Sequence, residues 1–185
     1  MRKVLKEDFF NRDTKIVAQE LLGKFLVQKI NGREISAMIK ETEAYDGPYD
    51  KASHASKGRT KRTEIMFGKP GNFYVYLCYG MHYMLNVVTR EQGYPAAVLI
   101  RGAKLQGADL DGPGKITKLF GINKNFNGKV ASKSNNLWFE DRPVRQSLGV
   151  GGGVVIPKSR IKKLSRVGVN YAGPMWSSKK LRFVI

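Results

Sequence analysis

Two glutamates that could take or give a proton stand close together in a chain that has few acids. There are 15 Asp and Glu residues against 33 Lys and Arg, and Glu41 and Glu43 are separated by one residue in the stretch ETEAY at 41–45. Residues two apart on a strand point to the same face, so both carboxylates are expected on one face beside Tyr45. The pair is either a solvated strand end with acids bound to nearby lysines, or a catalytic pair facing a basic, aromatic surface.

A second feature is the aromatic stretch GNFYVYLCYGMHYMLNVV at 71–88. Its alternation from Phe73 to Cys78, the break at Tyr79-Gly80 and the apolar run after it predict a β-hairpin with a glycine in its turn. The aromatic residues could simply pack in a core, because aromatic side chains favour strands. The alternative is that Tyr79, beside the turn, points out of the protein as a wedge.

The charge of the chain favours the interpretation of Tyr79 as an exposed wedge. The formal net charge is +18, and such an excess indicates a polyanionic partner, most commonly nucleic acid. No apolar run approaches the ~20 residues of a membrane span, and the first ten residues lack the apolar core of a signal peptide. A single cysteine, Cys78, and two histidines argue against a disulfide and a Cys/His zinc site. We therefore expect a chain without metal, cofactor or membrane partner, cytoplasmic in a bacterium or nuclear in a eukaryote.

The elements that would position these residues can be read from the pattern. A helix is expected at Thr14–Leu22, followed by a strand at Lys24–Ile30, a hairpin turn at Asn31-Gly32 and a return strand at Glu34–Lys40 that runs into ETEAY. Later elements are a helix at Lys115–Phe120 and short strands at Pro95–Arg101, Leu137–Glu140, Val154–Ile156, Ser165–Gly173 and Lys180–Val184. The length of 185 residues is that of one domain.

Two basic or glycine-rich segments could contact phosphates. The polar stretch at 50–62 contains the donors Lys57, Arg59 and Thr60, although a surface loop would have the same composition. The stretch GPGK at 112–115 would let backbone N–H groups approach a phosphate at a helix start, but it lacks the spacing of a Walker loop. Arg101 ends an apolar run, so its side chain either extends to solvent or reaches a site.

Taken in order and spacing, these pieces resemble the alkyladenine (3-methyladenine or methylpurine) DNA glycosylase family. The resemblance is carried by ETEAY, His54, the aromatic hairpin, Arg101, GPGK and RVGV at 166–169, and it runs from about Phe9 to Phe183. It implies a single α+β domain over residues 1–185, with a curved, open-barrel-like antiparallel sheet flanked by helices and a protruding hairpin. It also implies a monomer that acts on damaged double-stranded DNA.

The resemblance implies roles for individual residues. Glu43 would activate the attacking water, Arg101 would lie near the water and the flipped nucleotide, and Tyr79 would fill the gap left in the duplex. The residues expected around the extruded base are Tyr45, His54, Tyr76, Met84 and Asn86, with Asn86 disfavouring the amino group of normal guanine. The residues expected on the DNA backbone are Lys57, Arg59, Thr60, Gly114 and Lys115. His82 and Met84 differ from the animal relatives, which leaves the range of lesions open.

The chemistry agrees with these residue types. A base inside a duplex must be flipped out before its glycosidic bond can be attacked. Purines alkylated at N3 or N7 are cationic, and the rings of Tyr45 and Tyr76 would attract them by up to ~2 kcal/mol when desolvated. The protein then needs a carboxylate to orient and deprotonate water and to stabilise positive charge on the sugar. Because the motif contains no candidate lysine nucleophile, strand-cleaving lyase activity is not expected.

Two other classes of protein share parts of this pattern. A non-catalytic RNA- or ribosome-binding protein would have the same charge and aromatic residues, but it would have no use for two acids on a basic surface. A nucleotide-dependent enzyme could be built on the glycines at 112–115. Release of free base from methylated DNA, or binding of a nucleoside triphosphate, would distinguish them.

Overall fold

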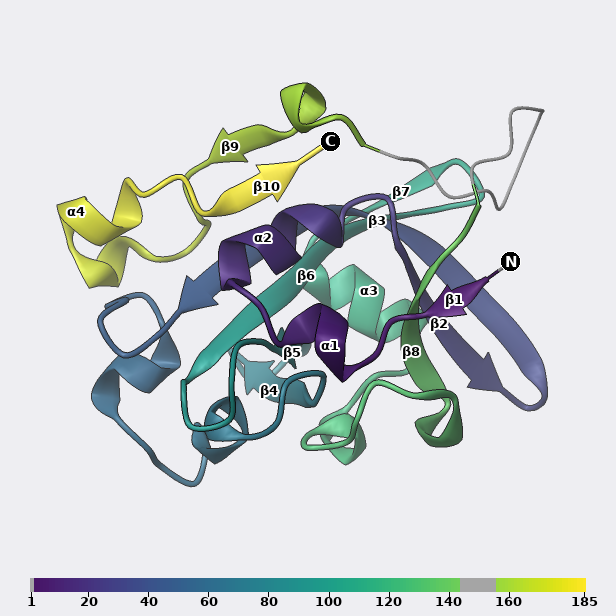
Figure 1. Ribbon diagram of the computed structural model, residues 1–185, viewed down its shortest axis with the longest axis horizontal. Coiled ribbons are helices and arrows are strands. Elements are labelled where there is room, and N and C mark those ends of the chain that lie inside the picture. Colours follow the sequence, from purple (N-terminus) through teal and green to yellow (C-terminus); the bar gives the residue numbers. More distant parts are fainter. Residues whose placement is uncertain (1, 144–155) are drawn as a thin grey trace.

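In the computed structural model, which describes residues 2–143 and 156–185, ten strands form one open antiparallel sheet (Figure 1). Their order is β1-β8-β2-β3-β6-β5-β4, with β7 beside β6 and β10 between β3 and β9. The strands are β1 (Lys3–Val4), β2 (Phe25–Ile30), β3 (Arg33–Asp46), β4 (Phe73–Cys78), β5 (His82–Val88), β6 (Ala96–Leu105), β7 (Ala108–Asp111), β8 (Leu137–Asp141), β9 (Lys162–Leu164) and β10 (Arg182–Val184). The expected α+β class with an antiparallel sheet is confirmed.

Strand β3 is the central strand of the sheet and contains both glutamates of the ETEAY stretch. It is 14 residues long and follows β2 through the predicted turn, in which Asn31 and Gly32 have φ values of 49° and 79°. Two successive residues at positive φ match the twist of the flanking strands. The second half of β3 pairs with β6 on one edge, and Glu41–Glu43 pairs with β10 on the other. The glutamates therefore lie where β3 has neighbours on both sides.

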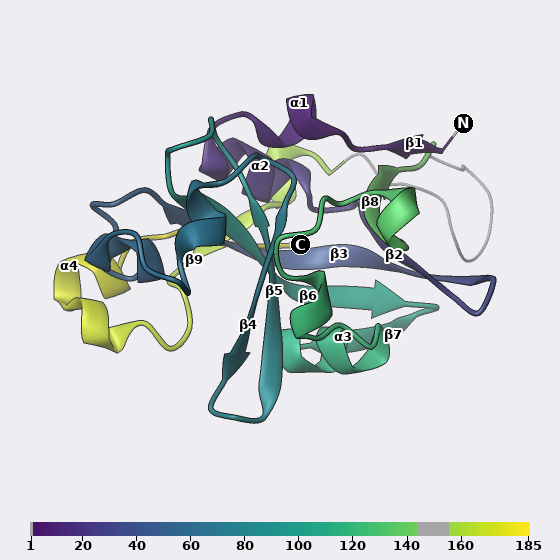
Figure 2. The ribbon, with the colours of Figure 1, turned by 90° about the horizontal axis from the view of Figure 1, so that it is seen from below.

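Helices cover the two faces of the sheet. Figure 2 shows α1 (Glu7–Phe10) and α2 (Thr14–Glu20) on one side and α3 (Pro113–Leu119) on the other, next to the β4–β5 hairpin. The predicted helix at Thr14–Leu22 is confirmed as α2. It begins there because the Asp13 side chain accepts hydrogen bonds from the backbone N–H groups of Lys15 and Ile16, at 2.9 and 3.2 Å.

The main core lies against the sheet and is rich in aromatic rings. Phe139 lies at its centre, with ring centroids 5.7 Å from Phe10 and 5.9 Å from Phe73. Aliphatic side chains from β3 and β6, among them Ile39 and Ile100, complete the same buried cluster. Because these side chains are buried on one face, a one-residue slip between β3 and β6 would move them out of the core, and this fixes the register on which a site built on these strands depends.

The aromatic hairpin is confirmed and projects from the sheet (Figure 2). At its tip, Tyr79 and Gly80 have φ values of 50° and 69°, and the N–H of Met81 bonds to the carbonyl of Cys78 at 3.1 Å. Tyr79 is 88% exposed, so it is a surface residue and not part of a core. A non-glycine residue at this φ costs about 1 kcal/mol.

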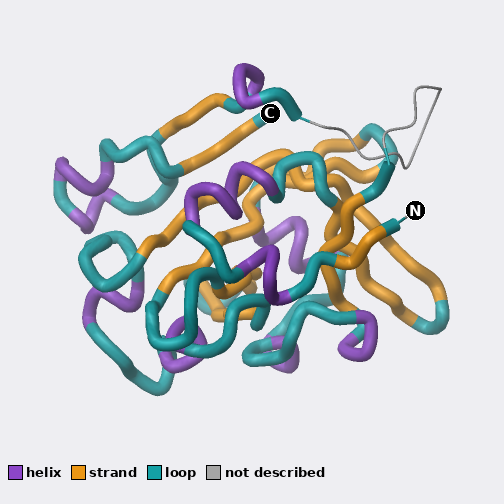
Figure 3. The backbone as a smooth tube through the Cα atoms, viewed as in Figure 1, coloured by secondary structure: helices purple, strands orange, loops and turns teal. Residues whose placement is uncertain are grey.

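The C-terminal part departs from the sequence prediction. The strand expected at Ser165–Gly173 is wrong, because this segment is a loop with a 3₁₀ turn at Asn170–Ala172, followed by the short helix α4 (Pro174–Ser177). Figure 3 shows these loops and turns between the paired strands β9 and β10. Gly168 and Gly173 have φ values of 72° and 83°, which no strand accommodates. The strand expected at 154–156 falls outside the described residues except for Ile156, which is in a loop.

Candidate active site

One row of residues crosses four strands on a single face of the sheet. In the strand register Glu43 is opposite Leu99, Leu99 is opposite Asn86, and Asn86 is opposite Tyr74. Directly opposed residues in antiparallel strands point to the same face. The sheet itself, and not a flexible loop, therefore places Glu43 near Asn86 and the aromatic residues.

Glu43 is 1% exposed, and donors contact both of its carboxylate oxygens. The backbone N–H of Val167 donates to Oε1 at 2.9 Å, and the hydroxyl of Tyr45 donates to Oε2 at 2.8 Å. Arg101 Nε lies 3.5 Å from Oε1. Burial raises the pKa of Glu43, and these donors together with the charges of Arg101 and Arg166 oppose the rise. The result is a carboxylate that is more basic than an exposed one.

Glu41 has a different environment on the same face. Its Oε1 accepts hydrogen bonds from Arg101 Nε and Arg182 Nη1, both at 2.9 Å. The interpretation of the two acids as a solvated strand end paired with lysines is therefore wrong, because both are buried and their cationic partners are arginines. Two guanidinium groups donate to Glu41 and balance its negative charge. Glu43 retains an environment suited to accepting a proton.

A β-bulge directs Arg101 toward the two glutamates. Glu41 is opposite Gly102 and Thr42 is opposite Ile100, so Arg101 has no partner residue on β3. Such an irregularity re-aims a side chain, and here the guanidinium reaches both carboxylates. A Cβ atom on Gly102 would lie only 2.9 Å from the Cβ of Glu41. The absence of a side chain at position 102 is what allows this close approach.

A narrow aromatic pocket of about 30 Å³ lies on the same face. Its lining includes four residues of the expected base site: Tyr45, His54, Tyr76 and Asn86. His54 Nδ1 lies 3.0 Å from the hydroxyl of Tyr74, and its ring meets Tyr76 edge-on at 4.7 Å between centroids. Burial, with the nearby charges of Arg62 and Lys57, lowers the pKa of His54 to about 4. The imidazole is therefore neutral at pH 7 and presents one donor and one acceptor.

Asn86 is held rigidly in the wall of this pocket. Its Nδ2 donates to the carbonyl of Tyr74 at 3.0 Å and to the carbonyl of Met84 at 3.3 Å. Carbonyl oxygens only accept hydrogen bonds, so they determine which end of the amide faces them. A side chain fixed in this way can select a base by shape, because it cannot swing aside.

Some residues of the pocket differ from the sequence expectation. Met84 is opposite Tyr76 in the hairpin register but is not among the residues that line the pocket. Tyr74 and Tyr171 do line it, and sequence reasoning assigned neither of them. The alternation of Tyr74 with Tyr76 along β4 could have identified the first. Nothing local could have identified Tyr171, which is 68% exposed and reaches the carbonyl of Ala52 at 2.8 Å from the C-terminal loop.

Each of the two tyrosines expected to stack on the base already contacts an arginine. The guanidinium carbon of Arg166 lies 4.7 Å from the ring centroid of Tyr45, and that of Arg62 lies 5.0 Å from the ring of Tyr76. From the sequence, these two rings are expected to attract a cationic base, but each ring already has a cation–π contact with an arginine. Both ring faces that these guanidinium groups cover are therefore already in contact with a cation.

The expected DNA-contacting residues lie outside the pocket on exposed segments. Lys57, Arg59 and Thr60 are exposed at and after the 3₁₀ turn His54–Lys57, and Arg59 pairs with Glu64 at 3.1 Å. Gly114 and Lys115 are in the first turn of α3, beside the hairpin. A Cβ atom on Gly114 would lie 2.9 Å from His82 Cγ. Packing against His82 explains this glycine without a phosphate.

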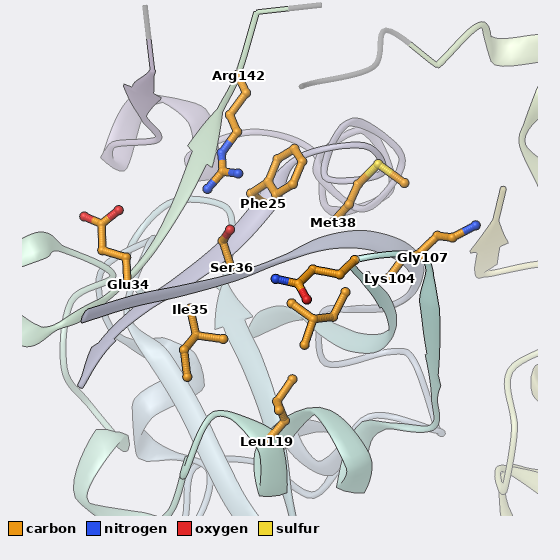
Figure 4. A pocket seen from close by; sticks show the side chains of 11 residues that line it. Phe25, Glu34, Ile35, Ser36, Met38, Lys104, Gly107, Leu119 and Arg142 are labelled. Atoms are coloured by element: carbon orange, nitrogen blue, oxygen red, sulfur yellow. The ribbon is translucent and has the colours of Figure 1, made fainter. Parts of the chain in front are cut away.

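A wider hollow of about 700 Å³ lies elsewhere, between the ends of β2, β3, β6 and α3 (Figure 4). Figure 4 shows Ile35 and Leu119 facing this space, with Arg142 over the ring of Phe25 at 3.9 Å. It contains none of the residues that the sequence singled out, and neither buried glutamate of β3 reaches it. The candidate active site is therefore identified by its chemistry and not by its volume.

The described residues 2–143 and 156–185 contain no group of three or more His, Cys, Asp or Glu side chains that could hold a metal ion. None of the helices in these ranges has the length and apolar character needed to cross a bilayer.

Comparison with known proteins places the chain in a family. Residues 8–185 match the family model described as methylpurine-DNA glycosylase. A protein of Desulfitobacterium hafniense is 47% identical over 92% of this chain and 89% of its own length. A protein of Methanocella arvoryzae is 42% identical over 92% and 86%, and one of Rickettsia felis is 50% identical over 74% and 76%. All three have been given the name 3-methyladenine DNA glycosylase. The chain therefore belongs to the methylpurine-DNA glycosylase family.

Proposed function

We propose that this protein is a monofunctional DNA glycosylase that removes alkylated purines, such as 3-methyladenine and 7-methylguanine, from double-stranded DNA. The observation that carries the proposal is Glu43, a buried carboxylate with a raised pKa in one sheet row with Asn86 and Tyr74. Family membership and the names of the relatives support the substrate class. Hypoxanthine and ethenoadenine are further candidate substrates, since the pocket recognises a flat ring by stacking and shape.

The reaction requires a water molecule, a base and a leaving group. The water oxygen bonds to C1′ of the sugar as the bond from C1′ to the base nitrogen breaks, and the departing base keeps the electron pair. Glu43 takes a proton from the water and places negative charge near the sugar as positive charge develops there. Arg101, 3.5 Å from Glu43 Oε1, holds the carboxylate in orientation. The products are a free base and an abasic site.

The nucleotide must leave the duplex before this can occur. Flipping costs a few kcal/mol and is cheapest for a damaged, weakly paired base. Tyr79, exposed between the ends of β4 and β5, is suited to occupying the vacated space. The tyrosines of the pocket then stack on the extruded base, which contributes about 1–3 kcal/mol per base. Lys57, Arg59, Thr60, Gly114 and Lys115 are proposed to contact the DNA backbone.

The test is Glu43→Gln, measured by release of free base under single-turnover conditions from duplexes that contain 7-methylguanine or hypoxanthine. Glutamine keeps the shape and can hold a water, so folding and lesion binding should survive. Loss of a general base typically costs ~10²–10⁴-fold in rate. The loss should be smaller for 7-methylguanine, which is already cationic and leaves more readily.

Glu41→Gln is the matched control, because Glu41 lies on the same strand face but is neutralised by two arginines. We expect it to retain most of the activity. Equal losses at both positions, or full activity of Glu43→Gln with intact binding, would contradict the assignment. If the unaltered protein releases no base from either duplex while binding nucleic acid, the alternative of a non-catalytic RNA- or ribosome-binding protein is favoured.

A further inference from the structure

A second charged pair is buried next to Glu43 and has no part in the mechanism above. The side chains of Arg166 and Asp50 are 0% and 1% exposed. Both Nη atoms of Arg166 donate to the carboxylate of Asp50, Nη2 at 2.8 Å, and Nη1 also donates to the carbonyl of Ala44 at 2.9 Å. Arg166 Nε is buried and has no hydrogen-bond partner among the described residues.

Stability alone is a weak explanation for this pair. Taking two charges out of water costs several kcal/mol per ion, and well-packed apolar residues of similar volume are often as stabilising. The incomplete hydrogen bonding at Nε makes the pair still less favourable. A reason for its presence must therefore come from what it does for its neighbours.

Those neighbours are the catalytic carboxylate and the ring beside it. Ala44, whose carbonyl Arg166 holds, lies between Glu43 and Tyr45 in β3. Val167, the residue after Arg166, donates its N–H to Glu43 at 2.9 Å. The guanidinium also lies against the ring of Tyr45 at 4.7 Å. Arg166 thus joins the C-terminal loop to β3 at the point where Glu43 must be oriented.

We propose that the Arg166–Asp50 pair positions Glu43 and sets its charge, with Arg166 favouring the ionised carboxylate and Asp50 limiting that effect. This inference rests on the proposed role of Glu43 as the general base. Arg166 is a positioning residue, since it acts through Val167 and through its charge and not on the substrate. Both members of the pair are needed, because an uncompensated cation would hold Glu43 too strongly ionised to be an effective base.

The charges around Glu43 support this division of roles. From β6, Arg101 lies 3.5 Å away, and from its own strand Tyr45 donates to it. Arg182 on β10 donates a hydrogen bond to Glu41 on β3, so these two charges compensate each other. The guanidinium of Arg166 lowers the pKa of Glu43 while burial raises it. Removing either member of the pair should therefore change the pH at which Glu43 becomes ionised, and in opposite directions.

The experiment is the pH dependence of single-turnover release of 7-methylguanine from a duplex. This base carries a fixed positive charge and needs no proton to leave, so the acidic limb of the profile reports Glu43. Arg166→Gln removes the cation and should move the limb to higher pH. Asp50→Asn leaves the cation uncompensated and should move it to lower pH. Shifts of about 1 pH unit are expected, as for a charge close to a carboxylate.

Three further variants make the result specific. Arg166→Lys retains the charge and should keep the limb at its original pH even if the rate falls. The double variant Asp50→Asn with Arg166→Gln should return the limb toward its original position. Arg142→Gln is the matched control, because Arg142, just after β8, forms a similar pair with the buried Glu140 of that strand, 2.6 Å apart. It should lower thermal stability without moving the limb.

The outcomes separate this inference from the proposed function. Shifts in the same direction for the two single variants, or unmoved limbs while Glu43→Gln remains inactive, would overturn the role of the pair and leave Glu43 as the base. Full activity of Glu43→Gln would overturn the proposed mechanism itself. If Arg166→Gln does not fold, the other two variants complete the test. Arg166→Lys should leave the acidic limb in place, and Asp50→Asn should move it to lower pH.

Discussion

The backbone N–H of Val167 donates a hydrogen bond to Oε1 of Glu43 at 2.9 Å, across 124 positions of the chain. Glu43 is part of a rigid strand, whereas Val167 belongs to a loop after β9. The orientation of the carboxylate thus depends on a segment that a strand prediction would have placed in a hydrogen-bonded ladder. The loop is essential here because it leaves the N–H of Val167 free to point at a side chain.

Substitutions of Tyr79 should separate a wedge from a structural residue. Tyr79→Ala and Tyr79→Gly both remove the ring from the exposed hairpin tip, so both should weaken lesion binding and slow flipping while the fold persists. Tyr79→Gly should also raise the free energy of unfolding, by about 1 kcal/mol relative to alanine, because glycine accepts the φ of 50° without strain. Urea unfolding and binding to a 7-methylguanine duplex check both effects. Unfolded variants would instead mean that the ring holds the hairpin together.

Asn86→Ala should relax discrimination against undamaged guanine. The Asn86 amide is clamped by two backbone carbonyls and can reject an exocyclic amino group by shape, which the smaller alanine cannot do. The measurement is the ratio of 7-methylguanine release to guanine release from the same duplex. A ratio that stays constant would assign the discrimination to another residue of the pocket.

His54 should make stability depend on pH between about 4 and 6.5. Its pKa falls from 6.5 to about 4 in the folded protein, so in this window the unfolded chain binds the extra proton. Stability contributed by neutral His54 is therefore present above pH 6.5 and is lost as the pH falls toward 4. His54→Gln should flatten this slope in urea unfolding from pH 4 to 7. A slope that stays the same in His54→Gln would assign this pH dependence to another group.

Gly102→Ala should disturb the two glutamates through packing. The added Cβ would lie 2.9 Å from Glu41 Cβ and 3.0 Å from Glu41 Oε2, inside a sheet that cannot yield easily. Overpacking of this kind typically costs 1–3 kcal/mol, and displacement of Glu41 and Arg101 should also slow base release. Gly114→Ala is the comparison, because its Cβ would meet the side chain of the exposed His82. Equal stability of the two variants would show that the bulge is more adaptable than its geometry indicates.

Several features of this protein could be predicted from the sequence because they depend on local pattern. Alternation and the Asn31-Gly32 and Tyr79-Gly80 turns are sufficient to predict the two hairpins, since turn type and strand period are properties of neighbouring residues. The spacing of Glu41 and Glu43 similarly predicts that they share a face. The order of the motifs indicated the family, which residues 8–185 match.

Tertiary structure alone decided how those parts work together. The bulge that turns Arg101 toward both glutamates depends on the register of β3 and β6. The different environments of Glu41 and Glu43 arise from β10 and from Val167, which are more than 100 residues away. The burial that raises the pKa of Glu43 requires the whole sheet and the C-terminal loop. A local pattern carries no information about such contacts, because they exist only after distant segments pack and exclude water.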